Sequence, residues 1–87
     1  MEIVRRASAG TMESSDVYVE VTPGNGLQIE LQSVVAQQFG AAIEQTVREV
    51  FAEQGVQNAL VRVVDRGALE CVIRARVETA ILRGKEG

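Results

Sequence analysis

The 87-residue chain contains no histidine and no tryptophan, and only one cysteine, one proline and one lysine. Without an imidazole it has no histidine general base, no Ser-His or Cys-His nucleophile pair and no histidine metal ligand. Its lone cysteine, Cys71, cannot form an internal disulfide, which favours a reducing compartment. Aromatic residues make up 3% of the chain, too few for a platform that stacks single-stranded bases. The net charge of −3 is the wrong sign for a surface that binds nucleic-acid phosphates.

The composition is otherwise that of an ordinary globular protein, with 46% hydrophobic and 24% charged residues. Its length predicts a single domain over residues 1–87, with a frayed tail at 84–87. Arg5 and Arg6 are not followed by an apolar stretch, so a signal peptide is not expected. The apolar runs are also too short to cross a bilayer. We therefore expect a cytoplasmic protein with no membrane partner.

The acidic and basic residues are unevenly distributed along the chain. Residues 13–53 contain seven acids and one base, a local charge of −6, whereas residues 54–87 carry +2. A solvated surface is the simplest explanation. The alternative is an acidic segment that steers docking onto basic partner surfaces. The seven acids are Glu13, Asp16, Glu20, Glu30, Glu44, Glu49 and Glu53.

Alternating apolar residues predict three strands and one further strand after a helix. Residues 17–21 and 27–31 alternate with period two around the turn signal Pro23-Gly24-Asn25-Gly26, so they are predicted to form a hairpin. Residues 3–11 are more weakly strand-like and would pair with 17–21 across the turn Glu13-Ser14-Ser15-Asp16. Residues 56–64 read as the fourth strand.

Two segments keep the 3.6-residue period of an amphipathic helix. The first, of about 18 residues, follows Ser33 as a plausible N-cap, has Val35 and Phe39 on its apolar face and stops at Gly55. The second runs from Ala68 to Arg83, with Leu69 on its core face; a strand over 69–74 competes, but length favours a helix. The predicted fold is α+β: a two-layer sandwich with an antiparallel-rich sheet of about four strands and two helices on one face.

No constellation of residues in the chain predicts catalysis. Cys71 is expected to be a packing residue on a helix flank with Ala75 and Leu82, which would contact a partner or another copy. Arg76 lies within the apolar face and is expected to snorkel or to pair with a carboxylate at the sheet edge. Glu13 and Asp16 supply too few ligands for a cation, so no metal site is predicted.

The polar turn at Glu13-Ser14-Ser15-Asp16 has two readings. By composition it is an ordinary loop. With no base to activate it, a serine there could act only as a point where a separate enzyme attaches a group. Such an attachment requires an exposed hydroxyl on a tip that a transferase can grip.

Three stretches of the chain resemble the acyl carrier protein of citrate lyase, the gamma subunit of that complex. They are Ala9-Gly10-Thr11-Met12-Glu13-Ser14-Ser15-Asp16-Val17, Gln38-Phe39-Gly40-Ala41-Ala42-Ile43, and the segment from Asp65 to Glu78. The resemblance extends in order along nearly the whole chain. In that family the serine directly after the glutamate carries the prosthetic group, which corresponds to Ser14. Ser15 is the second candidate, at a position where family members have glycine or serine.

The resemblance implies a covalently attached cofactor, 2′-(5″-phosphoribosyl)-3′-dephospho-coenzyme A, linked to Ser14 by a phosphodiester. It implies three partners: the alpha (acyl transferase) subunit, the beta (lyase) subunit and a prosthetic-group transferase. The chain would carry acetyl and citryl thioesters between the two subunits and would itself be non-catalytic, because the reactive thiol belongs to the cofactor. A nucleic-acid partner is not implied.

Two alternatives remain open from the sequence. The carrier of malonate decarboxylase uses the same cofactor and a related serine turn; the residues Gly10-Thr11-Met12-Glu13 and 65–78 favour citrate lyase. A cofactor-free assembly or regulatory module is the second alternative, because small α+β sandwiches serve many functions.

Overall fold

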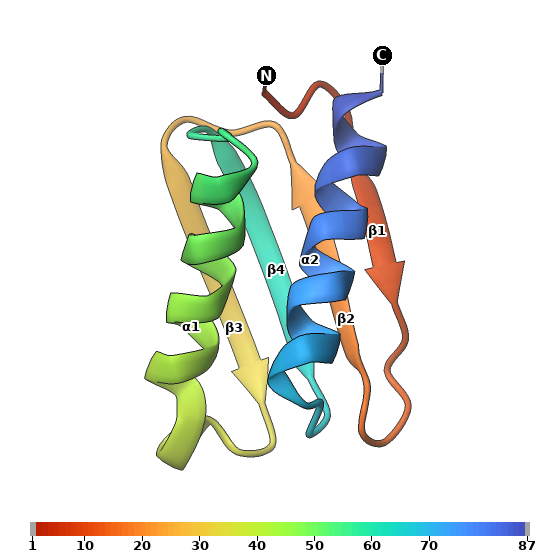
Figure 1. Cartoon of the computed structure of the whole chain (residues 1–87), viewed down its shortest axis with the longest axis vertical. Coiled ribbons are helices and arrows are strands. Elements are labelled where there is room, and N and C mark those ends of the chain that lie inside the picture. The colour runs from red at the N-terminus through yellow and green to blue at the C-terminus, as the bar shows by residue number, and fades with distance from the viewer. Residues whose placement is uncertain (1, 87) are drawn as a thin grey trace.

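The computed structural model describes residues 2–86 and has two layers, a mixed four-stranded sheet and two helices that cover one of its faces (Figure 1). The sheet order is β1-β2-β4-β3, with β3 parallel to β4 and the other neighbours antiparallel. This confirms the predicted α+β class. The elements in chain order are β1 Ala7–Gly10, β2 Val17–Thr22, β3 Leu27–Ser33, α1 Ala36–Glu53, β4 Ala59–Asp65 and α2 Glu70–Lys85.

The core lies between the helices and the sheet, where the alternating residues of the central strands face inward. Val17, Val19 and Val21 of β2 are fully buried, and so are Val61 and Val63 of β4. Each such valine contributes about 2 kcal/mol through burial of its side chain. The alternate residues of β3, Gln28, Glu30 and Gln32, are exposed on the uncovered face. The period-two pattern therefore sets the two faces of the sheet as expected.

The hairpin predicted between residues 17–21 and 27–31 is wrong. β4 lies between β2 and β3, and β3 pairs with β4 in parallel, Leu27 opposite Ala59 and Ser33 opposite Asp65. The chain passes the start of β4 here, where the Gly26 N–H donates to Asn58 Oδ1 (2.9 Å) and the Ala59 N–H donates to the Gly26 carbonyl (3.0 Å). The turn signal was correct, but two sequential strands need not pair when a later strand can enter between them.

The first helix has the predicted length of 18 residues but begins differently. Ser33 ends β3 and is not its N-cap; the cap position is Val35, whose own N–H donates to Ser33 Oγ (3.1 Å). At the other end, Gly55 has φ +69° directly after the C-cap residue Gln54. The glycine therefore provides the left-handed residue predicted for the helix terminus.

The last segment is a helix, so the competing strand over residues 69–74 is wrong. Buried Asp65 precedes it and accepts from the Ala68 N–H (3.0 Å), which fixes the loop that leads into α2. The fraying expected at 84–87 does not include Gly84 and Lys85, which belong to α2. Gly84 is buried, and its carbonyl accepts from the Val4 N–H (2.9 Å). Gly87 lies outside the described residues.

No helix within residues 2–86 is long and apolar enough to cross a membrane.

Candidate functional site

The predicted attachment turn joins β1 to β2 at one end of the molecule, beside the loop between β4 and α2 (Figure 1). Two backbone hydrogen bonds connect the turn to that loop. The Ser15 N–H donates to the Arg66 carbonyl, and the Arg66 N–H donates to the Asp16 carbonyl, both at 2.9 Å. The turn therefore continues the β2–β4 pairing beyond the sheet and is fixed against it.

Asp16 organises the turn through both oxygens of its carboxylate. Oδ2 accepts from the Thr11 hydroxyl (2.7 Å), and Oδ1 accepts from the Val17 N–H (2.7 Å). Arg76 of α2 donates to both oxygens, from Nε to Oδ1 and from Nη2 to Oδ2, each at 3.1 Å. Of the two outcomes expected for Arg76, snorkelling or pairing with a carboxylate at the edge of the sheet, the structure has the pairing. A bidentate pair of this kind fixes orientation as well as distance.

These contacts lower the pKa of Asp16 from its ordinary value of 3.8 to about 2. The largest cause is the hydrogen bond from Thr11, followed by the Val17 N–H and then by Arg76. Each donor stabilises the charged carboxylate, so proton binding becomes less favourable. Asp16 is consequently a weak base at neutral pH, and its function in the turn is structural.

Gly10 ends β1 with φ +89° and allows the chain to enter the turn. A Cβ atom at this position would lie 1.9 Å from the Val17 carbonyl oxygen and 3.3 Å from Cδ of Arg76. Both the left-handed backbone and the lack of space require glycine here. Gly10 thus lets the Arg76 side chain reach Asp16.

Ser14 and Ser15 are both exposed at the tip of the turn. Ser15 has φ +66°, a left-handed conformation that glycine adopts more easily. This backbone geometry is a physical reason for the glycine found in place of serine at the position of Ser15 in some members of the family that the chain resembles. Exposure alone does not separate the two serines, so the attachment at Ser14 stays a prediction.

Ser14 has none of the surroundings of a catalytic nucleophile. Within residues 2–86 the Ser14 hydroxyl makes no hydrogen bond, and the donors described above occupy the nearby Asp16 carboxylate. Residues 2–86 also contain no group of three or more His, Cys, Asp or Glu side chains that could hold a metal ion. The geometry can present a hydroxyl to another enzyme, because the tip is ordered and the oxygen is accessible.

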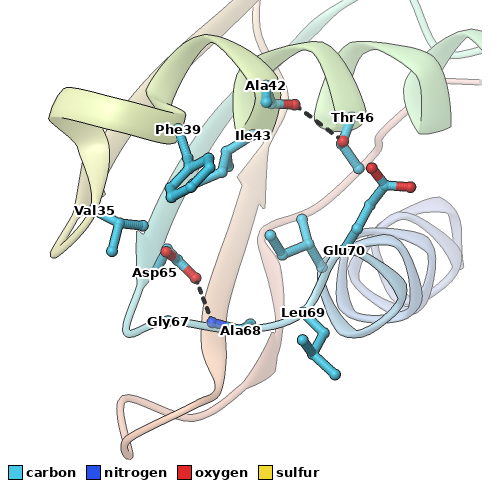
Figure 2. Close-up of a pocket in the computed structure, with 11 residues that line it drawn as sticks. Val35, Phe39, Ala42, Ile43, Thr46, Asp65, Gly67, Ala68, Leu69 and Glu70 are labelled. Atoms are coloured by element: carbon cyan, nitrogen blue, oxygen red, sulfur yellow. Dashed lines mark hydrogen bonds between the residues drawn. The ribbon is translucent and has the colours of Figure 1, made fainter.

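A pocket of about 360 Å³ opens at the same end of the molecule, between the first half of α1 and the β4–α2 loop (Figure 2). Sequence reasoning missed this pocket. It placed Phe39 and Leu69 on core faces of their helices, yet they are 53% and 72% exposed. Leu69 precedes α2 instead of lying within it. The apolar spacing of the sequence did not indicate that these residues line a pocket, because a pocket-lining residue and a core residue have the same spacing.

Cys71 is exposed near the start of α2, and Ala75 and Leu82 are exposed on the same helix. Within the isolated chain Cys71 is therefore not a core residue. Packing of this flank against a partner or another copy stays a prediction.

Ion pairs partly neutralise the acidic segment. Within residues 2–86, five of its seven acids are ion-paired, for example Glu44 with Arg48 (2.9 Å) and Glu53 with Arg74 (2.7 Å). Exposed pairs of this kind contribute little to stability, but they reduce the field that a partner would experience. Docking of this segment onto basic surfaces stays a prediction.

Comparison with known proteins identifies relatives along nearly the whole chain. A family model described as "Malonate decarboxylase delta subunit" matches residues 4–84. Citrate lyase acyl carrier protein 2 of Salmonella typhimurium is 57% identical over 88 residues, which cover 99% of this chain and 91% of the relative. The citrate lyase acyl carrier protein of Klebsiella pneumoniae has the same identity and coverage.

A solved structure has the same fold. In the crystal structure of a Pseudomonas malonate decarboxylase hetero-tetramer in complex with malonate, one chain superimposes with a TM-score of 0.79 at 27% identity. The match covers 91% of this chain and 82% of that chain. The carriers of citrate lyase are thus considerably more similar in sequence than the malonate decarboxylase subunit.

Proposed function

This chain belongs to the family of citrate lyase acyl carrier proteins, and from that membership we propose that it is the acyl carrier subunit of a citrate lyase. The observation that carries the proposal is 57% identity over nearly the full length of such carriers. An exposed serine on an ordered tip, with no catalytic constellation around it, is what a carrier requires. The chain is accordingly a non-catalytic subunit that holds a prosthetic group.

The proposed attachment point is Ser14, and the proposed group is 2′-(5″-phosphoribosyl)-3′-dephospho-coenzyme A. When bound, the group supplies a thiol on a flexible arm, which forms thioesters with acyl groups. The residues present are compatible with it, because the Ser14 hydroxyl is exposed and unpaired within residues 2–86. A phosphodiester at this oxygen therefore displaces no hydrogen bond among the residues that the structure describes.

Residues of the turn and of two neighbouring segments hold the serine in a fixed place for a transferase. Asp16 is hydrogen-bonded to Thr11 and to Arg76 of α2 on one side of the tip, and the Ser15 N–H donates to the Arg66 carbonyl. A preorganised substrate loop loses less conformational entropy when an enzyme binds it. The ordered tip therefore supports recognition by a prosthetic-group transferase.

The proposed partners are the alpha (acyl transferase) and beta (lyase) subunits of the complex, in the cytoplasm. A carrier that is assembled with both subunits presents the acyl group on its flexible arm to each active site at high effective concentration. Acetyl and citryl thioesters would be the forms that pass between them. The higher identity to citrate lyase carriers than to the malonate decarboxylase subunit favours citrate over malonate as the substrate.

Intact mass spectrometry of the chain co-expressed with its prosthetic-group transferase system tests the proposal. The wild-type chain should gain the mass of the prosthetic group, and Ser14→Ala should gain none. Ser15→Gly is the matched control and should be modified fully, since glycine suits the left-handed backbone at that position. Modification of Ser14→Ala would place the site elsewhere, and an unmodified wild-type chain would contradict the function.

A second measurement separates the two acyl substrates. The modified chain, acetylated on the thiol of its arm, is combined with the purified alpha and beta subunits of citrate lyase and citrate in one reaction, and with the purified subunits of malonate decarboxylase and malonate in another. Citrate should be consumed with formation of oxaloacetate, and malonate should not be decarboxylated. The reverse result would assign the chain to malonate decarboxylase.

A further inference from the structure

The pocket beside the attachment turn has two apolar walls, one from α1 and one from the β4–α2 loop together with the start of α2 (Figure 2). Phe39, Ala42 and Ile43 of α1 form one wall, and Ala68, Leu69 and Ile73 form the other. Its volume of about 360 Å³ falls within the range of small-molecule sites. Its walls are partly solvated, so the isolated chain exposes apolar surface that a neutral ligand could cover.

The Ser14 turn is physically connected to this pocket. Ser15 is hydrogen-bonded to Arg66, and the next residue, Gly67, lines the pocket. One strand-to-strand step and two steps along the chain separate Ser14 from Gly67, so their Cα atoms are no more than roughly 13 Å apart. A nucleotide joined to an extended pantetheine chain spans this distance, so a group attached at Ser14 can reach the pocket.

The charges of the pocket select against anionic ligands. Asp65 and Glu70 contribute carboxylates to its lining, and no lysine or arginine of residues 2–86 lines it. Asp65 is 1% exposed, and its carboxyl oxygens accept from the Ser33 hydroxyl (2.8 Å) and from the Ala68 N–H (3.0 Å), so its side chain is held in place in the floor of the pocket. An acyl group that carries free carboxylates would be repelled, and an uncharged acyl group would not.

We propose that this pocket binds the acyl end of the chain's own prosthetic arm in its neutral acetyl form and excludes the citryl form. The proposal rests on the proposed function of Ser14. The arm of the carrier then has two positions. An acetyl thioester lies in the pocket, shielded from water, and a citryl thioester stays in solvent, where the lyase subunit can bind it. Shelter matters because water can attack the thioester carbonyl, which breaks the C–S bond and yields acetate and the free thiol.

Weak binding is sufficient for this arrangement. A short flexible tether gives an effective concentration of about 1 mM. A dissociation constant of the same size would keep the arm in the pocket about half of the time, which slows hydrolysis about twofold. The arm would still leave within the time that a partner subunit needs to engage it.

The pocket is tested first in trans, with the unmodified full-length chain and no prosthetic group. The ¹H–¹⁵N spectrum is recorded during titration with S-acetylpantetheine and, separately, with S-succinylpantetheine, which carries a carboxylate. The acetyl compound should shift the amide signals of Ala68 and Ile73 with a millimolar dissociation constant, and the succinyl compound should bind at least several-fold more weakly. Equal binding of both, or no shift at these residues, overturns the proposal.

Two neighbouring alanines of α1 supply matched variants. Ala42 lines the pocket and Ala41 does not, and both are exposed. Ala42→Phe fills the pocket and should abolish the titration shifts, whereas Ala41→Phe should leave them unchanged. Thermal unfolding of each variant shows that it is folded. Retained binding in Ala42→Phe contradicts the pocket as the site.

The modified, acetylated chain gives the second readout, the loss of the acetyl group followed by intact mass. Hydrolysis should be about twofold faster in Ala42→Phe than in the wild type and unchanged in Ala41→Phe. Equal rates in all three overturn the sheltering. A chain that never acquires the group refutes the proposed function instead, and the titration in trans then still decides whether the pocket binds an acetyl thioester.

Discussion

Two turns of this fold, one rich in serine and acidic residues and one rich in glycine, are held in different ways. Residues 11–16 between β1 and β2 join neighbouring strands, and residues 23–26 between β2 and β3 join strands that β4 separates. Backbone hydrogen bonds to Arg66 and a side-chain network hold the first turn, with Asp16 at the centre of the network and Arg76 reaching it from α2. Close contact with the start of β4 holds the second, through the Gly26 N–H and Asn58.

The difference shows that a turn signal reports where the chain bends and not which strands meet. Proline, glycine and asparagine set the backbone of residues 23–26 locally. The partner of β3 is decided instead by α1, which returns the chain so that β4 pairs parallel to β3. In the first turn the chain bends between two strands that do pair as a hairpin. A residue distant in sequence, Arg76, then fixes the Asp16 side chain in that turn.

Substitution of Gly10 by alanine should produce the largest effect on either turn. The new Cβ would meet the Val17 carbonyl oxygen at 1.9 Å on a backbone with φ +89°, so stability should fall by about 3 kcal/mol or more. Urea denaturation measures the loss. Gly26→Ala is the control: φ is +75° but nothing lies within 4 Å, so the cost should be about 1 kcal/mol. Equal losses would refute the steric requirement at Gly10.

Gly24→Ala should have an intermediate effect and should act on the second turn alone. A Cβ there would lie 2.9 Å from backbone atoms of Ala59 and Leu60, and separation of the two segments should cost about 2 kcal/mol. Hydrogen exchange should increase at the Ala59 amide, while the Ser15 amide keeps its protection. Increased exchange at both amides would mean that the two turns are coupled.

Low pH should weaken the hydrogen bonds of Asp16 that hold the first turn, and it should leave the second turn unchanged. The pKa of Asp16 is lowered to about 2, chiefly by the Thr11 hydrogen bond. A lowered carboxyl pKa stabilises the fold above about pH 4, the value in the unfolded chain, and this stability is lost as the pH falls toward 2. An NMR titration of the Asp16 carboxyl carbon measures the pKa directly. Arg76→Met should raise that pKa, and an unchanged value would show that the arginine contributes nothing.

The sequence was sufficient for most of the elements and for one long-range contact. Period-two and 3.6-residue patterns located the strands and both helices. For Arg76 in the apolar face of α2 the expectation was snorkelling or a carboxylate partner, and the structure has the partner. The strand order could not be obtained this way, because the hydrophobic patterns of β2 and β3 suit either a hairpin or a crossover. Ser33 also looked like an N-cap, although it ends a strand.

The candidate site was only partly accessible to the same reasoning. Physical chemistry identified a polar turn without a base, and Ser14 was singled out by resemblance to a family. The pocket could not be anticipated, because Phe39 and Leu69 have the spacing of core residues. Their exposure depends on how α1 and the β4–α2 loop separate at that end of the sheet, which is a property of the packed structure.

The contact between Asp16 and Arg76 spans 60 residues of the chain. The residues around Ser14 are synthesised well before α2, yet α2 must dock before the guanidinium reaches its carboxylate. Contacts of such sequence separation form late, since a long loop must close first. The shape of the tip therefore depends on the docking of α2, and an enzyme that reads this shape distinguishes a chain in which α2 is docked from one in which it is not.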